Sequence, residues 1–464
     1  MQKSTKIIAT IGPASDSKEI ISKMFEHGMN VARLNCSHGS HAYFSKVIDT
    51  IRDVSEDICI LLDTKGPEVR VGRVMDPVHL EHGMHIELTN RDIIASRDSF
   101  SIRYPHLNEI GIGSMIRIDD GLISLEVIGR QGKNLVAKVI DGGELIANKS
   151  CAIQGHNVRL PFLSAEDRKD IRFGVKKDVS IIAASFVRSQ EDVAELRRLV
   201  RDQMIISKIE HWKALEHIHG IIEASDGAMV ARGDLGAQLS LERVPKIQQE
   251  IIRECNVQAK PVIVATQMLE SMKDNPRPTR AEVSDVAQAI LQGADAVMLS
   301  AETGIGKYPV QAVHMMAKIA REYDHLVEGN MPSQHLRHTN VAQFVTEAAF
   351  HSTRHLHVKA ILTPTETGFT ARNVARYRPR VPIYAITRSM RVSRQLALTW
   401  GVHPICIPKK YTDLHGMIAE LISETHKRKL VDREDTVVVT AGHRLRKKGS
   451  TNLLEIHKVK DILK

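Results

Sequence analysis

The sequence lacks any apolar run long enough to cross a membrane. Its 464 residues include two Trp, and no apolar stretch approaches the ~18 residues that a membrane-spanning helix requires. The first residues, MQKSTKIIATIG, have no apolar core of the kind that marks a secretory signal. We therefore expect a protein with no membrane partner and no signal peptide.

Cysteine is also scarce. The five cysteines are an odd number, they are widely separated, and none forms a CxxC pair: Cys36, Cys59, Cys151, Cys255 and Cys406. This spacing argues against a disulfide framework and against a structural zinc site. It predicts a protein of the reducing cytoplasm.

A phosphate-binding loop of the GxxxxGK[ST] type is missing as well. The nearest match, GIGKY at 304–308, has the wrong spacing and a tyrosine after the lysine. If the protein binds a nucleotide, metal ions and cationic side chains must hold its phosphates.

The positive charge is confined to one part of the chain. The net charge is +9, yet residues 336–464 carry 23 Lys and Arg against 10 Asp and Glu, so the remaining chain is net −4. A basic surface can bind nucleic acid. Because the excess is restricted to the last quarter, we expect no nucleic acid at the main site.

Eight short, apolar, β-rich runs recur along the chain, most of them followed by helical patterns. Near-continuous apolar strands that alternate with helices indicate a parallel sheet buried on both faces, and eight of them predict a closed (β/α)₈ barrel. The runs span residues 6–12, 29–35, 58–66, 179–186, 204–210, 228–234, 261–268 and 294–302.

Two segments depart from this pattern. Residues 71–157 alternate apolar and polar side chains between turn signals such as DDG and DGGE, which predicts a small β-barrel lid inserted into the main barrel. Residues 336–464 return to strand and helix patterns and predict an open α/β domain. The TIM barrel itself then comprises residues 1–70 and 158–335.

Polar residues gather where the predicted barrel strands end. Active sites of such barrels lie at the carboxyl ends of the strands, so we expect these side chains to meet in one cavity. The set comprises Arg33, Asn35, Ser37, Asp63, Thr64, Lys65, Arg70, Lys208, Glu210, Arg232, Asp234, Thr266, Gln267, Ser300 and Glu302. For the stretch ARLNCSHG, a simple turn that closes a strand is the alternative.

The carboxylates Glu210 and Asp234 end successive predicted strands and suit a hard cation such as Mg²⁺. Lys208 lies two residues before Glu210, on the same strand face, where its ammonium could neutralise a transferring phosphoryl group. The alternatives are surface carboxylates and a solvated lysine. On the residues alone, a metal-dependent barrel lyase or aldolase acting on pyruvate or oxaloacetate stays possible, as does a non-catalytic basic scaffold that binds RNA.

A series of motifs resembles the pyruvate kinase family, in order and over essentially the whole chain. The motifs are LNCSHG, LDTKGPEVR, SKIE, ARGDLG, ATQMLESM, PTRAEVSDVA, DAVMLSAETGIGKYP and RYRP. The resemblance implies the fold derived above and the transfer of a phosphoryl group from phosphoenolpyruvate to ADP, giving pyruvate and ATP in glycolysis.

The resemblance also implies roles for individual residues. Mg²⁺ (or Mn²⁺) would bind Glu210 and Asp234, and K⁺ would bind Asn35, Ser37, Asp63 and Thr64. The substrate would contact Arg33, Lys208, Gly233, Asp234 and Thr266, of which Arg33, Lys208 and Thr266 are the expected catalytic residues. The nucleotide would contact Asn35, His38 and Arg70.

Two further positions are compared with the family. Glu68 matches relatives that need K⁺ rather than those with a lysine there. The family's lid carries a lysine that contacts nucleotide phosphate, and the chain has Gln154 at the position taken as equivalent. We therefore expect that charge to be missing, with His156 or Arg159 as substitutes.

The resemblance implies a homotetramer with a phosphorylated effector bound to the C-terminal domain. The effector would bind Thr365, Thr367, Gly368 and Thr370, with Arg444 and Lys447 closing over it. Family members that respond to fructose 1,6-bisphosphate often carry basic residues where this chain has Glu366 and Phe369. We therefore expect an effector with one phosphate, such as AMP, ribose 5-phosphate or glucose 6-phosphate.

Overall fold

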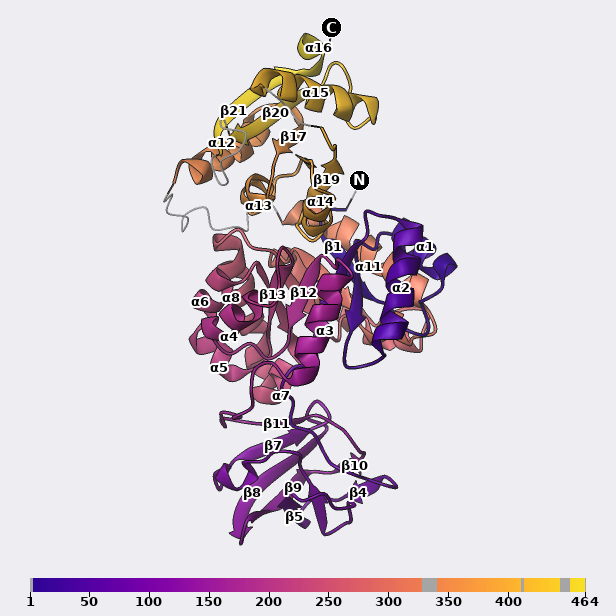
Figure 1. Cartoon of the computed structure of the whole chain (residues 1–464), viewed down its shortest axis with the longest axis vertical. Helices are drawn as coiled ribbons and strands as arrows, with labels where there is room; N and C mark the ends of the chain where they lie inside the picture. Colours follow the sequence, from indigo (N-terminus) through magenta and orange to yellow (C-terminus); the bar gives the residue numbers. More distant parts are fainter. Residues whose placement is uncertain (1–2, 328–339, 410–412, 443–450, 464) are drawn as a thin grey trace.

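The structure is a computed structural model that describes residues 3–327, 340–409, 413–442 and 451–463. The molecule is elongated (Figure 1). A β-rich unit lies at one end, a barrel of strands and helices lies in the middle, and an α/β unit that contains the C-terminus lies at the other end.

Eight parallel strands form a closed barrel, as the sequence predicted. Each predicted apolar run overlaps one of these strands, and β1 pairs with both β2 and β16 to close the ring. In the order in which they pair, the strands are β1 (Lys6–Thr10), β16 (Ala296–Leu299), β15 (Val262–Ala265), β14 (Gly227–Ala231), β13 (Met204–Ile209), β12 (Ile181–Ala184), β3 (Cys59–Asp63) and β2 (Val31–Asn35).

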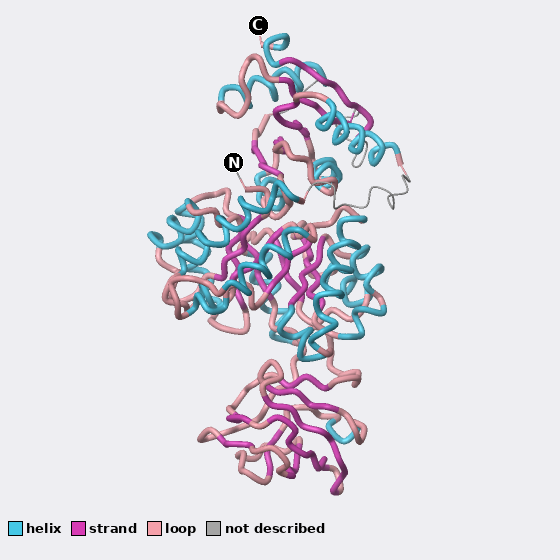
Figure 2. Tube along the Cα trace, turned by 180° about the vertical axis from the view of Figure 1, so that it is seen from behind, coloured by secondary structure: helices cyan, strands magenta, loops and turns pink. Residues whose placement is uncertain are grey.

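Helices follow the strands and cover the outside of the barrel (Figure 2). Local signals fix where several of them begin. Ser164 and Thr279, for example, each form a capping box with an acidic residue three positions later. The helices are α1 (Lys18–Glu26), α2 (His41–Val54), α3 (Ala165–Lys176), α4 (Gln190–Arg197), α5 (Trp212–Glu216), α6 (Ile218–Ala224), α7 (Arg232–Gln238), α8 (Val244–Val257), α9 (Arg280–Leu291), α10 (Ala301–Gly304) and α11 (Pro309–Tyr323).

The segment inserted between β3 and α3 is almost entirely strand and loop (Figure 2). It has an apolar core of its own, which includes Phe100 and Tyr104. A six-stranded sheet contains, in order, β11 (Cys151–Ile153), β7 (Met115–Ile118), β8 (Ile123–Gln131), β9 (Asn134–Asp141), β5 (His85–Thr89) and β6 (Ser99–Ser101). A second sheet pairs β10 (Gly143–Leu145) with β4 (Val78–Leu80).

The C-terminal unit is an open sheet covered by helices, as predicted. Four strands are parallel and the last is antiparallel, in the order β19 (Val402–Cys406), β18 (Ile383–Thr387), β17 (Val358–Pro364), β20 (Thr436–Gly442) and β21 (Thr451–Lys458). Its helices are α12 (Val341–His355), α13 (Phe369–Ala375), α14 (Met390–Leu396), α15 (Leu414–Lys427) and α16 (Val459–Ile462).

The C-terminal unit packs firmly against the barrel. Ala397 and Leu398, which follow α14, join the apolar cluster inside the barrel. Beside them, the fully buried Arg378 donates hydrogen bonds to both carboxylate oxygens of Asp295, the residue before β16. This unit therefore closes the amino end of the barrel, whereas the inserted sheets lie beyond its carboxyl end (Figure 1).

Within the described residues, every helix is too short or too polar to span a membrane.

Candidate active site

A cavity of about 420 Å³ lies between the carboxyl ends of the barrel strands and the inserted sheets. Polar side chains make up most of its lining. Those expected from the strand ends are Arg33, Asn35, Ser37, Thr64, Lys65, Arg70, Lys208, Glu210 and Asp234, together with His38 from the same motif. Much of the expected set therefore meets in one place.

Six residues of the expected set do not line this cavity: Asp63, Arg232, Thr266, Gln267, Ser300 and Glu302. For these, the expectation of a single cavity is wrong. Glu302 illustrates the reason. Its carboxylate is buried and accepts hydrogen bonds from the backbone N–H groups of Ser300 and Leu269, so it ties two loops of the barrel together.

The floor of the cavity is a chain of buried charges. Arg33 Nε donates to Asp63 Oδ2 over 2.8 Å, and Lys208 Nζ lies 3.1 Å from Asp63 Oδ1. The same ammonium lies 2.9 Å from Glu210 Oε1. Asp63 itself is fully buried below the cavity, where it positions the two cations.

These contacts set the protonation of the site. Burial disfavours every charged form here, but Lys208 and Arg33 together hold the pKa of Asp63 below its usual value. For Lys208, the carboxylates of Asp63 and Glu210 outweigh burial and raise its pKa. The lysine is thus a fixed positive charge at the base of the cavity.

Ser185 was not anticipated from the sequence. It follows β12, accepts a hydrogen bond from Lys208 Nζ over 2.7 Å and donates to the carbonyl of Thr64 over 2.6 Å. The next residue, Phe186, has a φ of 55° and donates its backbone N–H to Glu210 Oε2. This strained turn holds both the lysine and the glutamate in place. A serine at the end of an apolar run was the available signal.

Glu210 and Asp234 form a pair of carboxylates that suits a hard divalent cation. Burial, and then the charge of Glu210, raises the pKa of Asp234 well above its usual value. Burial also raises the pKa of Glu210. Two buried carboxylates that repel each other call for a compensating cation, so the residues fit Mg²⁺. They are only two, and no cluster of three or more His, Cys, Asp or Glu forms a metal site in the described part of the chain.

Thr266 lies behind Asp234. Its φ is 67°, in the left-handed region that a β-branched residue rarely adopts. Its hydroxyl accepts a hydrogen bond from the backbone N–H of Gly233 over 2.9 Å, and its carbonyl accepts from Arg232 over 2.7 Å. The strained loop after β15 is therefore fastened to the first turn of α7, which carries Asp234.

The inserted domain contributes a lysine to the cavity, contrary to the sequence-based expectation. Lys149 lines the cavity and lies 2.9 Å from Asp119. Gln154, taken as the equivalent of the family's lysine, lies elsewhere, with its amide near the carbonyl of Ala237 at the end of α7. His156 does not line the cavity either, and its ring forms a hydrogen bond with the hydroxyl of Tyr104.

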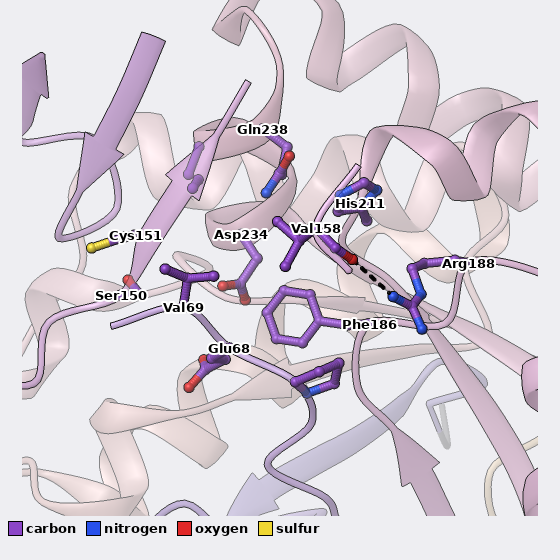
Figure 3. A pocket seen from close by; sticks show the side chains of 13 residues that line it. Glu68, Val69, Ser150, Cys151, Val158, Phe186, Arg188, His211, Asp234 and Gln238 are labelled. Carbon is purple, nitrogen blue, oxygen red and sulfur yellow. Dashed lines mark hydrogen bonds between the residues drawn. The ribbon is translucent and has the colours of Figure 1, made fainter. Parts of the chain in front are cut away.

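A second, smaller pocket lies where the inserted segment meets the barrel (Figure 3). Asp234 and Glu68 line it, and Arg188 donates hydrogen bonds to the carbonyls of Val158 and Leu160. These bonds fasten the segment that returns from the inserted sheets to the barrel.

The residues expected to bind an effector lie in the C-terminal unit, on the far side of the barrel from the cavity (Figure 1). Thr365 accepts a hydrogen bond from the N–H of Gly368, which has a φ of 79°. Thr370 is buried and bonded to Thr451. Arg444 and Lys447 are outside the described residues.

Comparison with known proteins extends over the whole chain. Residues 2–313 match the family described as "Pyruvate kinase, barrel domain", and residues 343–457 match "Pyruvate kinase, alpha/beta domain". A pyruvate kinase of Sporosarcina psychrophila is 44% identical over 99% of this chain and 81% of its own length. That of Geobacillus stearothermophilus is 43% identical over 100% of this chain and 81% of its own.

Proposed function

This chain belongs to the pyruvate kinase family and is therefore a phosphotransferase, and we propose that it transfers the phosphoryl group of phosphoenolpyruvate to ADP, giving pyruvate and ATP. The observation that carries this proposal is the position of Lys208. Its ammonium lies between two buried carboxylates, on the floor of a polar cavity that is lined from the opposite side by Lys149.

Lys208 and Arg33 act on the phosphoryl group. Both are buried cations whose partners hold them in one geometry, so they need no rearrangement when charge develops on the transferring group. A preorganised cation stabilises the transition state more than the ground state, which is what raises turnover. Thr266 and the backbone of Gly233 lie beside Asp234, and we assign them to the carboxylate side of the substrate.

Glu210 and Asp234 would hold Mg²⁺ or Mn²⁺, which would supply positive charge to the phosphate and to the enolate oxygen of the substrate. Asn35, Ser37, Asp63 and Thr64 would hold K⁺. Glu68 supports a K⁺ requirement because it places a further carboxylate at the cavity, where Arg70 is its ion-pair partner.

The nucleotide would lie between the barrel and the inserted domain. We assign Asn35, His38 and Arg70 to it, and we add Lys149, because this lysine faces the cavity from the inserted domain. Each of these two cations already has an ion-pair partner, Glu68 for Arg70 and Asp119 for Lys149, so the nucleotide phosphates would compete with these carboxylates for both.

For regulation, we infer a phosphorylated effector at Thr365, Thr367 and Gly368, acting through a homotetramer. Support comes from the loop geometry and from two neighbouring cations. Arg372 donates to the carbonyl of Thr367, and Arg388 forms an ion pair with Glu366.

The test is ATP formation from phosphoenolpyruvate and ADP, with and without Mg²⁺, and with and without K⁺. We expect activity only with the divalent cation, and more of it with K⁺. A metal-dependent lyase or aldolase acting on pyruvate or oxaloacetate would need no nucleotide. Turnover of either acid without ADP, together with no ATP formation, would therefore overturn the proposal.

A further inference from the structure

Arg117 joins the inserted domain to the barrel. It lies on β7, and its Nη1 donates hydrogen bonds to the carbonyls of Gly236 and Leu239, each over 3.0 Å. Gly236 is in the last turn of α7 and Leu239 is its C-cap residue, so both carbonyls lie at the helix end where the dipole favours a cation. Turned so that its oxygen faces Arg117, the Gln154 amide accepts from the guanidinium over 3.3 Å. Arginine suits this place because its planar fork can reach several acceptors at once.

The other end of α7 belongs to the active site. Asp234 lies in the first turn, and the N–H of Gly233 is bonded to the hydroxyl of Thr266. A helix of seven residues is only ~10 Å long and moves as one body. Arg117 is thus bonded to the same helix, α7, that carries one of the two proposed metal-binding carboxylates.

The position of the inserted domain decides what faces the cavity. Lys149 and Asp120 line the cavity from that domain, while Lys208, Glu210 and Asp234 line it from the barrel. Figure 1 places α7 directly against β7 and β11. The covalent connections are two chain segments, and one of them is fastened by Arg188 through the carbonyls of Val158 and Leu160. Arg117 adds a further contact with the barrel, and this contact comes from a strand of the inserted sheet.

We propose that Arg117 is a positioning residue: by holding the carboxyl end of α7, it fixes the inserted domain at the angle at which Lys149 faces Lys208 across the cavity. The proposal rests on the proposed function, since it assigns the cavity between the two lysines to the substrates. Binding of a substrate held by the barrel alone should depend on this contact much less than binding of a nucleotide that touches both the barrel and the inserted domain.

The test compares Arg117→Met with Arg117→Lys and with the control Arg130→Met. Arg130 is on the neighbouring strand β8 and donates to the carbonyl of Ile110 inside the same domain. Hydrogen bonds from a charged donor are strong enough that their loss should raise KM for ADP about tenfold. We expect Arg117→Met to do so, with binding of phosphoenolpyruvate in the absence of ADP unchanged, Arg117→Lys to recover part of the loss, and Arg130→Met to match wild type.

A distance measurement separates this proposal from the function on which it rests. Spin labels at Ile112 on the inserted domain and at Ile305 on the barrel, both exposed, should report a broader distance distribution in Arg117→Met than in wild type or Arg130→Met. A broader distribution in a protein that makes no ATP would uphold the positioning role and refute the proposed activity. An unchanged distribution and an unchanged KM for ADP would overturn the positioning role.

Discussion

At the scale of single residues, the site depends on opposite charges that are buried together. Lys208 is held by Asp63, Glu210 and Ser185, so its ammonium has little freedom. Arg33 shares Asp63 with it. Removing one charge of such a group leaves the others buried without an opposite charge, so any substitution here also affects the remaining members.

Replacing Lys208 by methionine should reduce turnover by at least ~10³-fold, because the positive charge that meets the transferring phosphoryl group is lost. Binding of Mn²⁺, followed by electron paramagnetic resonance, and binding of phosphoenolpyruvate should persist, since the carboxylates remain. Lys213→Met, on α5, is a matched control and should keep wild-type turnover. Normal turnover in Lys208→Met would refute the assigned role.

The lysine on the inserted domain provides a second test. Lys149→Met should raise KM for ADP several-fold and leave KM for phosphoenolpyruvate nearly unchanged, because Lys149 lies on the wall assigned to the nucleotide. Gln154→Lys should not lower KM for ADP, because residue 154 lies near the end of α7 and outside the cavity. Steady-state kinetics with each substrate varied would check both. An unchanged KM for ADP in Lys149→Met, together with a lower KM for ADP in Gln154→Lys, would instead place the nucleotide contact at position 154.

Position 154 shows what sequence reasoning does not reach at this scale, because Lys149, and not Gln154, lines the cavity from the inserted segment. The alternating pattern predicts strands in the inserted segment, and strands are there. It does not say which residue of a connection faces the barrel, because that depends on how β11 pairs with β7. A shift of a few residues in a short loop leaves the pattern intact but changes the side chain in the cavity.

At the scale of elements, the barrel strands could be predicted because each is buried on both faces and reads as a continuous apolar run. Their polar ends were harder to place. Arg232 and Asp234 were expected to end a strand, but they lie in the first turn of α7. Thr266 and Gln267 both have left-handed backbone, which no apolar pattern reveals. The strands follow from hydrophobicity, whereas the loops follow from packing between distant segments.

The loop between β17 and α13 is the proposed effector site, and its charges predict which phosphorylated compounds activate the enzyme. Glu366 forms an ion pair with Arg388, over 2.6 Å to Nη2, and would repel a second phosphate. At sub-saturating phosphoenolpyruvate, AMP, ribose 5-phosphate or glucose 6-phosphate should therefore activate more strongly than fructose 1,6-bisphosphate. Glu366→Gln should improve the response to the bisphosphate, because it removes the negative charge and frees Arg388.

Glu434→Gln is the matched control for this loop, since Glu434 also forms an exposed ion pair, with Lys460 of the same domain. It should leave the order of activators unchanged. Strong activation of the wild type by the bisphosphate, with none by any monophosphate, would contradict the prediction.

At the scale of the whole molecule, the junction between the barrel and the C-terminal unit should govern stability in acid. His403 on β19 lies there, and Lys6 donates a hydrogen bond to the carbonyl of the preceding residue, Val402. Burial, and then the charges of Lys6 and Lys3, lower the pKa of His403 to about 2. In the unfolded chain a histidine titrates near ~6.5, so the unfolded state binds the extra proton as the pH falls.

As the pH drops below ~6.5, the free energy of unfolding should consequently decrease, by up to ~1.4 kcal/mol per pH unit from this one group. The decrease should continue until the folded protein also takes up the proton. His403→Gln should make the loss less steep between pH 6.5 and 4.5, as measured by urea-unfolding midpoints. His85→Gln, an exposed histidine on β5, should keep the wild-type slope. Equal slopes for all three proteins would mean that other groups control acid unfolding.

The pairing of β1 with β16 has a consequence for how the chain is made. The first strand of the barrel ends at Thr10, and its closing neighbour begins only at Ala296. At ~5–20 residues per second, a ribosome needs roughly 15–60 s to synthesise the part between them. During that time β1 exposes an apolar edge, while the inserted domain, whose core is complete by residue 160, can already fold. We expect nascent chains to need protection from aggregation until β16 emerges.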